Sequence, residues 1–143
     1  MSSLQPTDSE YESRVRASFA RQRAMQLMGA SLRRVEPGAV TIALPYREDL
    51  TQQHGYVHAG IITAIADSAC GYAAYTLMPA GSEVLSVEFK VNLLRPAEGE
   101  EFLAEAKVLK AGRTLTVTRC DVYSLAGGEA KLVATMLATM IRR

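Results

Sequence analysis

The segment from Gln52 to Cys70, QQHGYVHAGIITAIADSAC, carries the residues of this chain that are most able to do chemistry. A polar run that includes Gln52 and His58 leads into a nearly continuous apolar stretch, and that stretch contains one carboxylate, Asp67. An ionised carboxylate in an apolar interior is costly unless it finds hydrogen-bond donors or faces water in a cavity. Asp67 is therefore either a structural acid bonded to neighbouring donors such as Tyr72, or a general base or nucleophile in a pocket.

The start of the same apolar segment favours the catalytic interpretation. His58, Ala59 and Gly60 are expected in the first turn of a helix, where backbone N–H groups lack intrahelical partners and the helix dipole favours negative charge. Such N–H groups can hold the oxygen of a reacting carbonyl, and a carboxylate that activates water or attacks directly then suffices for acyl transfer. The segment is thus typical of an oxyanion hole followed by a catalytic acid.

The spacing of these groups has a consequence for the assembly. Gly60 and Asp67 share a helix face but lie about 10 Å apart along the axis, at roughly 1.5 Å per residue. A reacting carbonyl needs its partners about 3 Å away on each side. Two helices packed antiparallel about a two-fold axis would bring the amino end of one to the middle of the other. We therefore predict an obligate homodimer with shared active sites.

Hydrophobic patterns predict the elements that position these groups. Residues 60–77 are apolar almost all round and rich in alanine, which is typical of a buried helix that neighbouring backbone approaches closely. Residues 85–93 alternate between apolar and polar types, which predicts a strand with one core face and one wet face. Two runs divided at Pro37 and Gly38, and three runs after residue 100, are predicted to form hairpins. The fold class is therefore α+β, with an antiparallel sheet around one helix.

The length of 143 residues fits a single domain covering residues 1–143. Residues 1–29 are predicted to be an N-terminal helical extension, which opens on capping candidates at positions 7–9 and stops at Gly29. Its arginines are expected on a solvated helix face rather than in a phosphate site. This extension is interpreted as a covering helix.

Charge and composition argue against several kinds of partner. Lys and Arg total 16 against 15 Asp and Glu, so nothing favours nucleic acid or an anionic membrane. The first residues lack a secretory pattern, and no stretch reaches the roughly 18 apolar residues that span a bilayer. The two cysteines have neither metal-ligand spacing nor the number that a disulfide framework needs. We expect a soluble, cytoplasmic protein without a metal.

The string HGYVHAGIITAIADSACGYAA, followed by VLSVEFKVNLLRPAEGE, resembles the hotdog-fold acyl-CoA thioesterases of the PaaI-like (phenylacetic acid degradation) group. The resemblance covers the chain from about Ser31 to its end. It implies a hotdog fold, in which an antiparallel sheet wraps around a long central helix, and dimers that are often paired into tetramers. It also implies hydrolysis of an acyl-CoA thioester without a metal or other cofactor.

The resemblance also implies roles for individual residues. Asp67 matches the catalytic acid, which acts from the opposite subunit, and Ala59 lies where the family usually has a glycine whose amide polarises the thioester carbonyl. An alanine keeps this role only if its φ is negative. Gln52 falls at a position near that carbonyl, and Ser86 where a hydroxyl can hold the attacking water. His58 either donates toward the thioester or braces the turn, and bracing is favoured.

The phosphates of CoA require cations. Arg95, just past the long strand, and Lys110 with Arg113 at a hairpin turn are the predicted ligands, although each is equally well explained as an ordinary surface charge.

Two other functions remain open from the sequence. A hotdog hydratase or dehydratase acting on hydroxyacyl thioesters would share the architecture. It ranks second, because its chemistry needs a histidine and an acid poised at the α and β carbons, whereas His58 precedes the acid here rather than facing it. A non-catalytic acyl-CoA-binding protein would keep the groove without needing Asp67. The sequence leaves the acyl length open, and also whether Asp67 acts as base or nucleophile.

Overall fold

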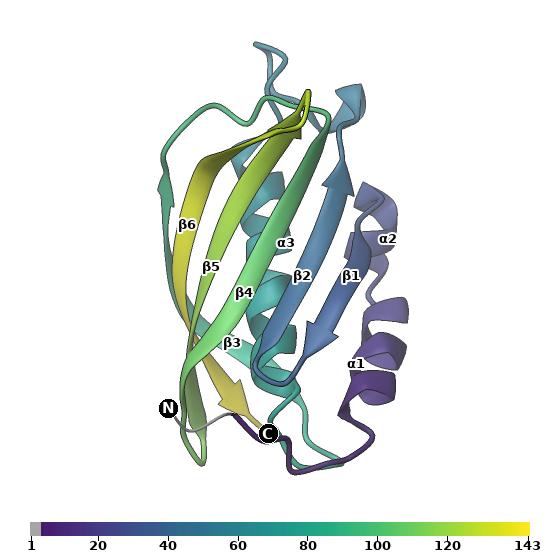
Figure 1. The fold of residues 1–143 in the computed structure, drawn as a ribbon, viewed down its shortest axis with the longest axis vertical. Coiled ribbons are helices and arrows are strands. Elements are labelled where there is room, and N and C mark those ends of the chain that lie inside the picture. Colours follow the sequence, from purple (N-terminus) through teal and green to yellow (C-terminus); the bar gives the residue numbers. More distant parts are fainter. Residues whose placement is uncertain (1–3) are drawn as a thin grey trace.

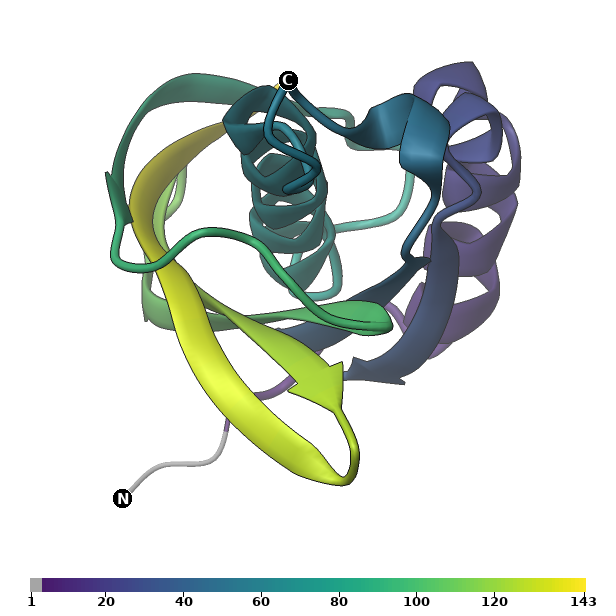
Figure 2. The same ribbon diagram turned by 90° about the horizontal axis from the view of Figure 1, so that it is seen from above.

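The computed structural model describes residues 4–143, in which a curved sheet wraps around one long helix (Figures 1 and 2). The helices are α1 (Tyr11–Ala20), α2 (Arg23–Met28) and α3 (Ala59–Tyr75), with a short 3-10 turn at Glu48–Leu50. The strands are β1 (Ser31–Glu36), β2 (Ala39–Pro45), β3 (Val84–Leu93), β4 (Glu101–Ala111), β5 (Leu115–Ala126) and β6 (Glu129–Arg142). All pairings are antiparallel, in the order β1-β2-β4-β5-β6-β3. The predicted α+β arrangement is confirmed.

Helix α3 is the centre of the core. Ile65, Ala69 and Ala73 have no exposed surface, and the helix packs against β2, β4 and β5. Small side chains on a helix let the strands approach closely, so the sheet can curl around it as Figure 2 shows. The predicted buried helix is therefore confirmed, and it ends shortly before Pro79 and Gly81 as the sequence indicates.

Strand β3 departs from the sequence pattern. It lies at one edge of the sheet, and Leu85, Val87, Phe89 and Leu93 retain 50%, 53%, 42% and 55% of their exposure. The prediction of one core face and one wet face is wrong for the single chain, because most residues of β3 are exposed on both faces within residues 4–143. The strand also has β6 as its one neighbour in the sheet of the described residues, so its outer edge is unpaired. The result is an apolar edge strand with unpaired backbone groups.

The N-terminal extension is two helices rather than one. The helix is interrupted at Gln22, whose backbone is extended between α1 and α2. The Gln22 side chain donates to the Tyr72 hydroxyl at 3.1 Å and accepts from the Ser68 hydroxyl at 2.7 Å, so the break is held by contacts to α3. The predicted stop at Gly29 is confirmed by its left-handed φ of 79°.

Arg14 in α1 is a structural residue, and the prediction that the arginines form a solvated face is wrong for it. Its guanidinium donates to the carbonyl oxygens of Tyr75, Met78 and Pro79 at 3.2, 2.9 and 3.2 Å, and it lies 4.4 Å above the Tyr75 ring. Nε also lies 3.2 Å from the Asp8 carboxylate, an ion pair without aligned hydrogen-bond geometry. Arg14 therefore satisfies carbonyls at and beyond the end of α3 and ties α1 to it.

Arg14→Ala should lower the free energy of unfolding by about 3 kcal/mol, because several partly buried carbonyls lose a charged donor. Urea denaturation of the two proteins measures the difference. Arg16→Ala is the matched control, since Arg16 pairs with Glu12 on an exposed helix face and should cost only about 0.5 kcal/mol. Equal effects of the two substitutions would show that the Arg14 contacts do not stabilise the docked helix.

The two cysteines lie in the core and are free thiols. A hydrogen bond with Cys70 and burial together hold the pKa of the Cys120 thiol well above its ordinary range. A thiol with a raised pKa and no solvent access carries little of the reactive thiolate. The pair is therefore expected to be chemically inert in the folded protein.

A thiol-reactive chromophore at neutral pH should label neither cysteine in the folded protein, and both after unfolding in guanidinium chloride. The absorbance change counts the reacted thiols against time. Rapid labelling of the native protein would show that the helix–sheet interface opens readily.

No helix within residues 4–143 is both long enough and apolar enough to cross a membrane. The same part of the chain holds no group of three or more His, Cys, Asp or Glu side chains placed to bind a metal ion.

Candidate functional site

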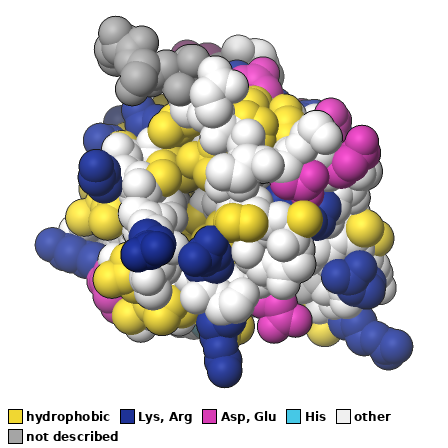
Figure 3. Space-filling model, turned by 90° about the horizontal axis from the view of Figure 1, so that it is seen from below, with side chains coloured by type: hydrophobic (Ala, Val, Ile, Leu, Met, Phe, Trp, Pro, Cys, Tyr) yellow, Lys and Arg dark blue, Asp and Glu magenta, His cyan; other side chains and the backbone are white. Residues whose placement is uncertain are grey.

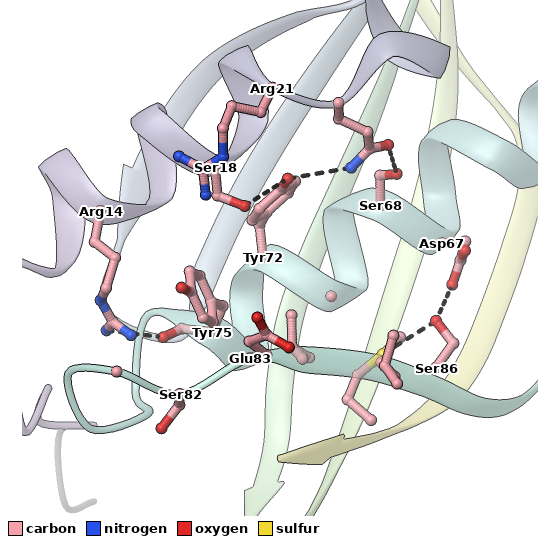
Figure 4. Close-up of a pocket in the computed structure, with 16 residues that line it drawn as sticks. Arg14, Ser18, Arg21, Asp67, Ser68, Tyr72, Tyr75, Ser82, Glu83 and Ser86 are labelled. Carbon is pink, nitrogen blue, oxygen red and sulfur yellow. Dashed lines mark hydrogen bonds between the residues drawn. The ribbon is translucent and has the colours of Figure 1, made fainter. Parts of the chain in front are cut away.

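Asp67 lies at the wall of a hollow of about 700 Å³ bounded by α1, α3 and the start of β3 (Figure 4). The Ser86 hydroxyl donates to its Oδ1 at 2.5 Å, and the same hydroxyl lies 3.4 Å from the sulfur of Met140. Asp67 is partly buried. A carboxylate held by one hydroxyl and open to a hollow can accept a proton from water.

A β-bulge in β3 turns Ser86 toward Asp67. Ser86 pairs with the buried Met140 on the inner face of β6, whereas Glu88, two residues later, pairs with Thr139 on the outer face. Strict alternation would have placed Ser86 and Glu88 on the same face. The extra residue between them, Val87, reverses the alternation, which is a common way for a strand to re-aim a side chain.

Tyr72 does not serve as the partner of Asp67. Its hydroxyl lies 3.2 Å from that of Ser18 and accepts from Gln22, which in turn accepts from Ser68. Figure 4 shows this chain of hydrogen bonds on the side of the hollow formed by α1 and α3. The polar network was not foreseen from the sequence, because Ser18 and Gln22 are about 50 residues from Tyr72. Asp67 is left with Ser86 as its hydrogen-bond partner within residues 4–143.

His58 braces the start of α3. It is the N-cap residue, and its Nδ1 accepts the N–H of Gly60 at 2.8 Å, which places the ring proton on Nε2. This contact supports the bracing role. It also occupies the Gly60 amide, so this amide is not free to polarise a carbonyl.

The amide of Ala59 is the available donor at this helix end. It has no hydrogen-bond partner within the described residues, and Ala59 itself is exposed. No residue other than glycine has a positive φ in residues 4–143, so the alanine is unstrained where the resemblance suggested a glycine. A free N–H at a helix N-terminus favours an oxyanion.

Gln52 offers a second donor in the hollow that Ala59 lines. Together with His58 and Ala59 it lines a second hollow of about 520 Å³, which is also lined by Leu93. The Gln52 side-chain oxygen accepts the backbone N–H of His54 at 2.5 Å, which leaves the side-chain NH₂ without a partner within residues 4–143. The second hollow thus holds a backbone donor and a side-chain donor.

The two hollows divide the predicted site into two parts. Asp67 and Ser86 line the first hollow and do not line the second, whereas Gln52, His58 and Ala59 line only the second. Ala59 and Asp67 are separated by roughly 12 Å along the axis of α3, at about 1.5 Å per residue. One chain therefore presents the carbonyl donor and the carboxylate at separate places.

The predicted phosphate ligands are also separated. Arg95 lines the second hollow, as Ala59 does. Lys110 and Arg113 flank the β4–β5 turn, where Thr114 accepts from the backbone of Arg142 at the far end of the sheet. Seen from below, this end of the molecule displays Lys and Arg side chains around apolar ones (Figure 3). Lys110 and Arg113 thus do not join Arg95 within one chain.

Known proteins resemble this chain in sequence and in fold. Residues 54–131 match the family described as the thioesterase superfamily. A solved thioesterase family protein from Silicibacter pomeroyi is 52% identical, with a TM-score of 0.91, and the match covers 92% of this chain and 97% of that one. Acyl-coenzyme A thioesterase 13 of Homo sapiens is 31% identical over 68% of this chain and 69% of that protein. The E. coli PaaI protein, at 18% identity, has a TM-score of 0.85 over 94% of both chains and shares the fold.

The extent of the matches defines what they support. The chain spans 61% and 69% of the length of the first two curated relatives that it matches. The family match covers more than half of the chain and includes α3 with Asp67. It confirms the resemblance to hotdog-fold thioesterases and supports a thioester hydrolase as the enzyme class. The chain belongs to the thioesterase superfamily.

Proposed function

We propose that the protein is an acyl-CoA thioesterase, which hydrolyses a thioester to a free carboxylic acid and CoA in two active sites shared between the subunits of a homodimer. The observation that carries the proposal is the division of the site. The carboxylate–hydroxyl pair of Asp67 and Ser86 and the free amide of Ala59 are the parts that acyl transfer needs, yet they line different hollows of one chain. A second copy related by a two-fold axis would supply the missing part to each site.

The edge strand β3 supports this assembly. It carries exposed apolar side chains, among them Val87, Phe89 and Leu93, and an unpaired backbone edge. An edge of this kind invites pairing with another strand, and two-fold pairing of β3 with its own copy would bury these side chains. The same strand contributes Ser86 to the first hollow and Leu93 to the second, so pairing at this edge would bring the halves of the site together.

In the proposed mechanism, the thioester oxygen accepts a hydrogen bond from the Ala59 amide, and the NH₂ group of Gln52 lies nearby as a second donor. Asp67 of the partner subunit takes a proton from water, which Ser86 positions. Attack of that water gives a tetrahedral oxyanion, and its collapse breaks the carbon–sulfur bond. A thiolate is a good leaving group, because alkyl thiols such as that of cysteine have a pKa of about 8.5, so the reaction needs no strong acid. His58 holds the turn that presents the Ala59 amide.

The role of a general base for Asp67 is supported by its contact with Ser86. The hydroxyl occupies Oδ1, which leaves Oδ2 to accept the proton of a water that the same hydroxyl can also bind. A single turnover in ¹⁸O-labelled water separates this route from a nucleophilic one. A base places the label in the released acid in the first turnover. A nucleophilic Asp67 forms a mixed anhydride, and water that attacks this anhydride at the Asp67 carboxyl carbon leaves the label on Asp67 and an unlabelled oxygen in the acid.

The experiment that tests the function is release of free thiol from a panel of short, medium, long and aromatic acyl-CoA thioesters. Hydrolysis of at least one of them, together with a dimer in analytical ultracentrifugation, is the expected result. If a folded dimer releases no thiol but hydrates an enoyl thioester, the hydratase interpretation replaces this one. Binding of acyl-CoA without any turnover would instead indicate a binding protein.

Arg95 is the proposed cation for the CoA arm, because it lines the same hollow as the Ala59 amide. Lys110 and Arg113 stay predictions of the sequence, since the β4–β5 turn that carries them reaches an active site only if the partner subunit brings it there.

A further inference from the structure

The first hollow is where the acyl group of the proposed reaction has room to lie. In the proposed dimer, the thioester carbonyl sits between Asp67 of one subunit and the Ala59 amide of its partner, and the carrier arm leaves along the second hollow. The other direction leads into the first hollow, whose volume of about 700 Å³ lies within the range of small-molecule sites. The side chains that line this hollow therefore meet the acyl group.

The N-terminal extension forms one wall of the first hollow. Arg14 and Ser18 lie one turn apart on α1, Arg21 and Gln22 follow just after its last residue, and all four line the hollow. Arg14 ties this wall to α3 through the carbonyls near the end of that helix. The extension thus takes part in shaping the site in addition to covering the core.

The hydrogen bonds in this wall leave one hydroxyl proton without an acceptor. The Ser68 hydroxyl donates to the Gln22 side-chain oxygen, and the Gln22 NH₂ donates to the Tyr72 hydroxyl. The Tyr72 and Ser18 hydroxyl groups lie 3.2 Å apart, and only one of their two protons can bridge them. The other proton has no acceptor within residues 4–143. One of these two hydroxyl groups, which Figure 4 shows between α1 and α3, can therefore donate to a ligand.

A free donor in this position distinguishes between acyl groups. Tyr72 is only 5% exposed, so water that reaches its hydroxyl does so through the hollow. An apolar acyl end that displaces this water leaves a buried donor unpaired, whereas an oxygen atom on the acyl group replaces the lost hydrogen bond. Sites built to hydrogen-bond a substrate group reject the analogue that lacks it.

Gly71 keeps the hollow open between Asp67 and Tyr75. It lies one turn from each of them on α3, and all three line the hollow. Glycine inside a helix is less stable than alanine, yet the φ of Gly71 is not positive, and a Cβ at this position would meet no atom within 4 Å. Neither backbone conformation nor packing within the chain explains this glycine. An acyl group that needs the space beside α3 does explain it.

The charged groups of the hollow favour a neutral oxygen over a carboxylate. Arg14 is engaged by carbonyls near the end of α3, and Arg21 is exposed and donates to the Ala17 carbonyl at 3.2 Å. Asp67 and Glu83 line the same hollow, and their negative charge opposes a second carboxylate on the acyl group.

We propose that the Ser18–Tyr72 hydroxyl pair determines acyl specificity and selects acyl groups that carry a neutral oxygen acceptor, such as a ketone, near the fifth carbon. The inference rests on the proposed thioesterase function. Tyr72 lies five residues beyond Asp67, which is about 7.5 Å along α3. Four carbon–carbon bonds of about 1.5 Å span roughly 5 Å in an extended chain, and a hydrogen bond adds about 3 Å. A ketone at carbon 5 therefore reaches the level of the hydroxyl pair.

The test compares 5-oxohexanoyl-CoA with 5-methylhexanoyl-CoA, in which a methyl group replaces the ketone oxygen. The wild type should prefer the ketone at least tenfold in kcat/KM, as expected when a buried donor is left unpaired by the methyl group. The double variant Ser18→Ala/Tyr72→Phe removes both hydroxyl groups and should reduce this preference to about twofold. No preference in the wild type, or an unchanged preference in the double variant, would overturn the proposal.

Tyr11→Phe/Ser13→Ala is the matched control. It removes the same two kinds of hydroxyl group from α1, but Tyr11 and Ser13 line neither hollow of the proposed site. The preference for the ketone should stay at its wild-type value. Thermal melts of both double variants establish that the comparison is made on folded protein.

Gly71→Ala tests the space beside α3. It should raise the melting temperature by about 3 °C, because alanine stabilises a helix relative to glycine. The ratio of kcat/KM for 5-oxohexanoyl-CoA to that for acetyl-CoA should fall about tenfold, since the added methyl group narrows the path of the longer acyl chain. An unchanged ratio would show that the acyl group does not enter this hollow.

A binding measurement distinguishes failure of this specificity from failure of the proposed function. The probes are S-(5-oxohexyl)-CoA and S-(5-methylhexyl)-CoA, thioethers that lack the reacting carbonyl, and titration calorimetry on the wild type and on Ser18→Ala/Tyr72→Phe needs no turnover. Tighter binding of the ketone by the wild type alone, in a protein that hydrolyses no thioester, would uphold the acyl site while the thioesterase proposal fails. Equal affinities of the two probes for the wild type would refute the acyl site even if the enzyme is active.

Discussion

Asp67→Asn should lower kcat for acyl-CoA hydrolysis by about a thousandfold, which lies within the range for loss of a general base. Asparagine has nearly the same shape as aspartate, and its carbonyl oxygen can still accept the Ser86 hydroxyl that now lies 2.5 Å from Oδ1. The local packing of α3 is thus retained while the proton acceptor is lost. The measurement is thiol release under saturating substrate, beside a thermal melt of the same preparation.

Asp49→Asn is the control for this substitution. Asp49 is exposed, pairs with the nearby Arg47, and lines neither hollow of the proposed site. It should leave kcat within about twofold of the wild type, as for an ordinary surface substitution. Retention of full activity in Asp67→Asn, or loss of activity that follows loss of folded protein, would show that Asp67 is a structural acid.

Ala59→Pro should lower kcat about a hundredfold or more, which is the usual effect of removing one oxyanion donor. Proline has no backbone N–H, and it is well tolerated at the first position of a helix because its fixed φ suits the helix. The preceding His58 has φ −58° and ψ 136°, which is the extended conformation that a residue before proline prefers. The substitution therefore deletes the proposed donor with little disturbance of α3. Ala59→Ser, which keeps the N–H, is the matched control.

Mixing the two inactive variants tests whether the sites are shared. In a heterodimer of Asp67→Asn with Ala59→Pro, one site combines the intact Asp67 with the intact Ala59 amide, and the other carries both defects. Random reassociation of equal amounts after mild denaturation makes half of the dimers mixed, so about one quarter of wild-type activity should return. If both groups acted within one chain, each chain would carry one defect and no activity would return.

Much of the candidate site was determined locally and so was predictable. The unbroken apolar run with many alanines predicts a buried helix, and the number of residues from the start of the run gives the position of Asp67 within that helix. The same holds for the hairpins, because Gly127 and Gly128 have positive φ and lie at a turn between two apolar runs. His58 and Ala59 begin α3 as expected, since a polar residue before an apolar run is a helix start signal.

Other features depend on contacts between segments that are distant in the chain. The break at Gln22 is explained by its contacts with Tyr72 and Ser68 in α3, which no periodicity in residues 1–29 reveals. Arg14 likewise leaves the expected solvated face because the carbonyls near the end of α3 need donors. Local pattern describes the average environment of a side chain, whereas a buried hydrogen bond depends on one specific partner.

The sequence by itself determined that the chain carries a helix with an acid in its middle and unpaired amides at its start. The rise per residue of a helix then separates the acid from these amides along the helix axis. Only the tertiary structure decided which hydroxyl contacts the acid and which amide remains free to bind a carbonyl oxygen. The β-bulge after Ser86 turns its hydroxyl toward Asp67, and the His58 ring takes the Gly60 amide, which leaves that of Ala59. The physical reason is that strand register and side-chain hydrogen bonds are set by the partner elements, so they become fixed when the sheet closes around α3.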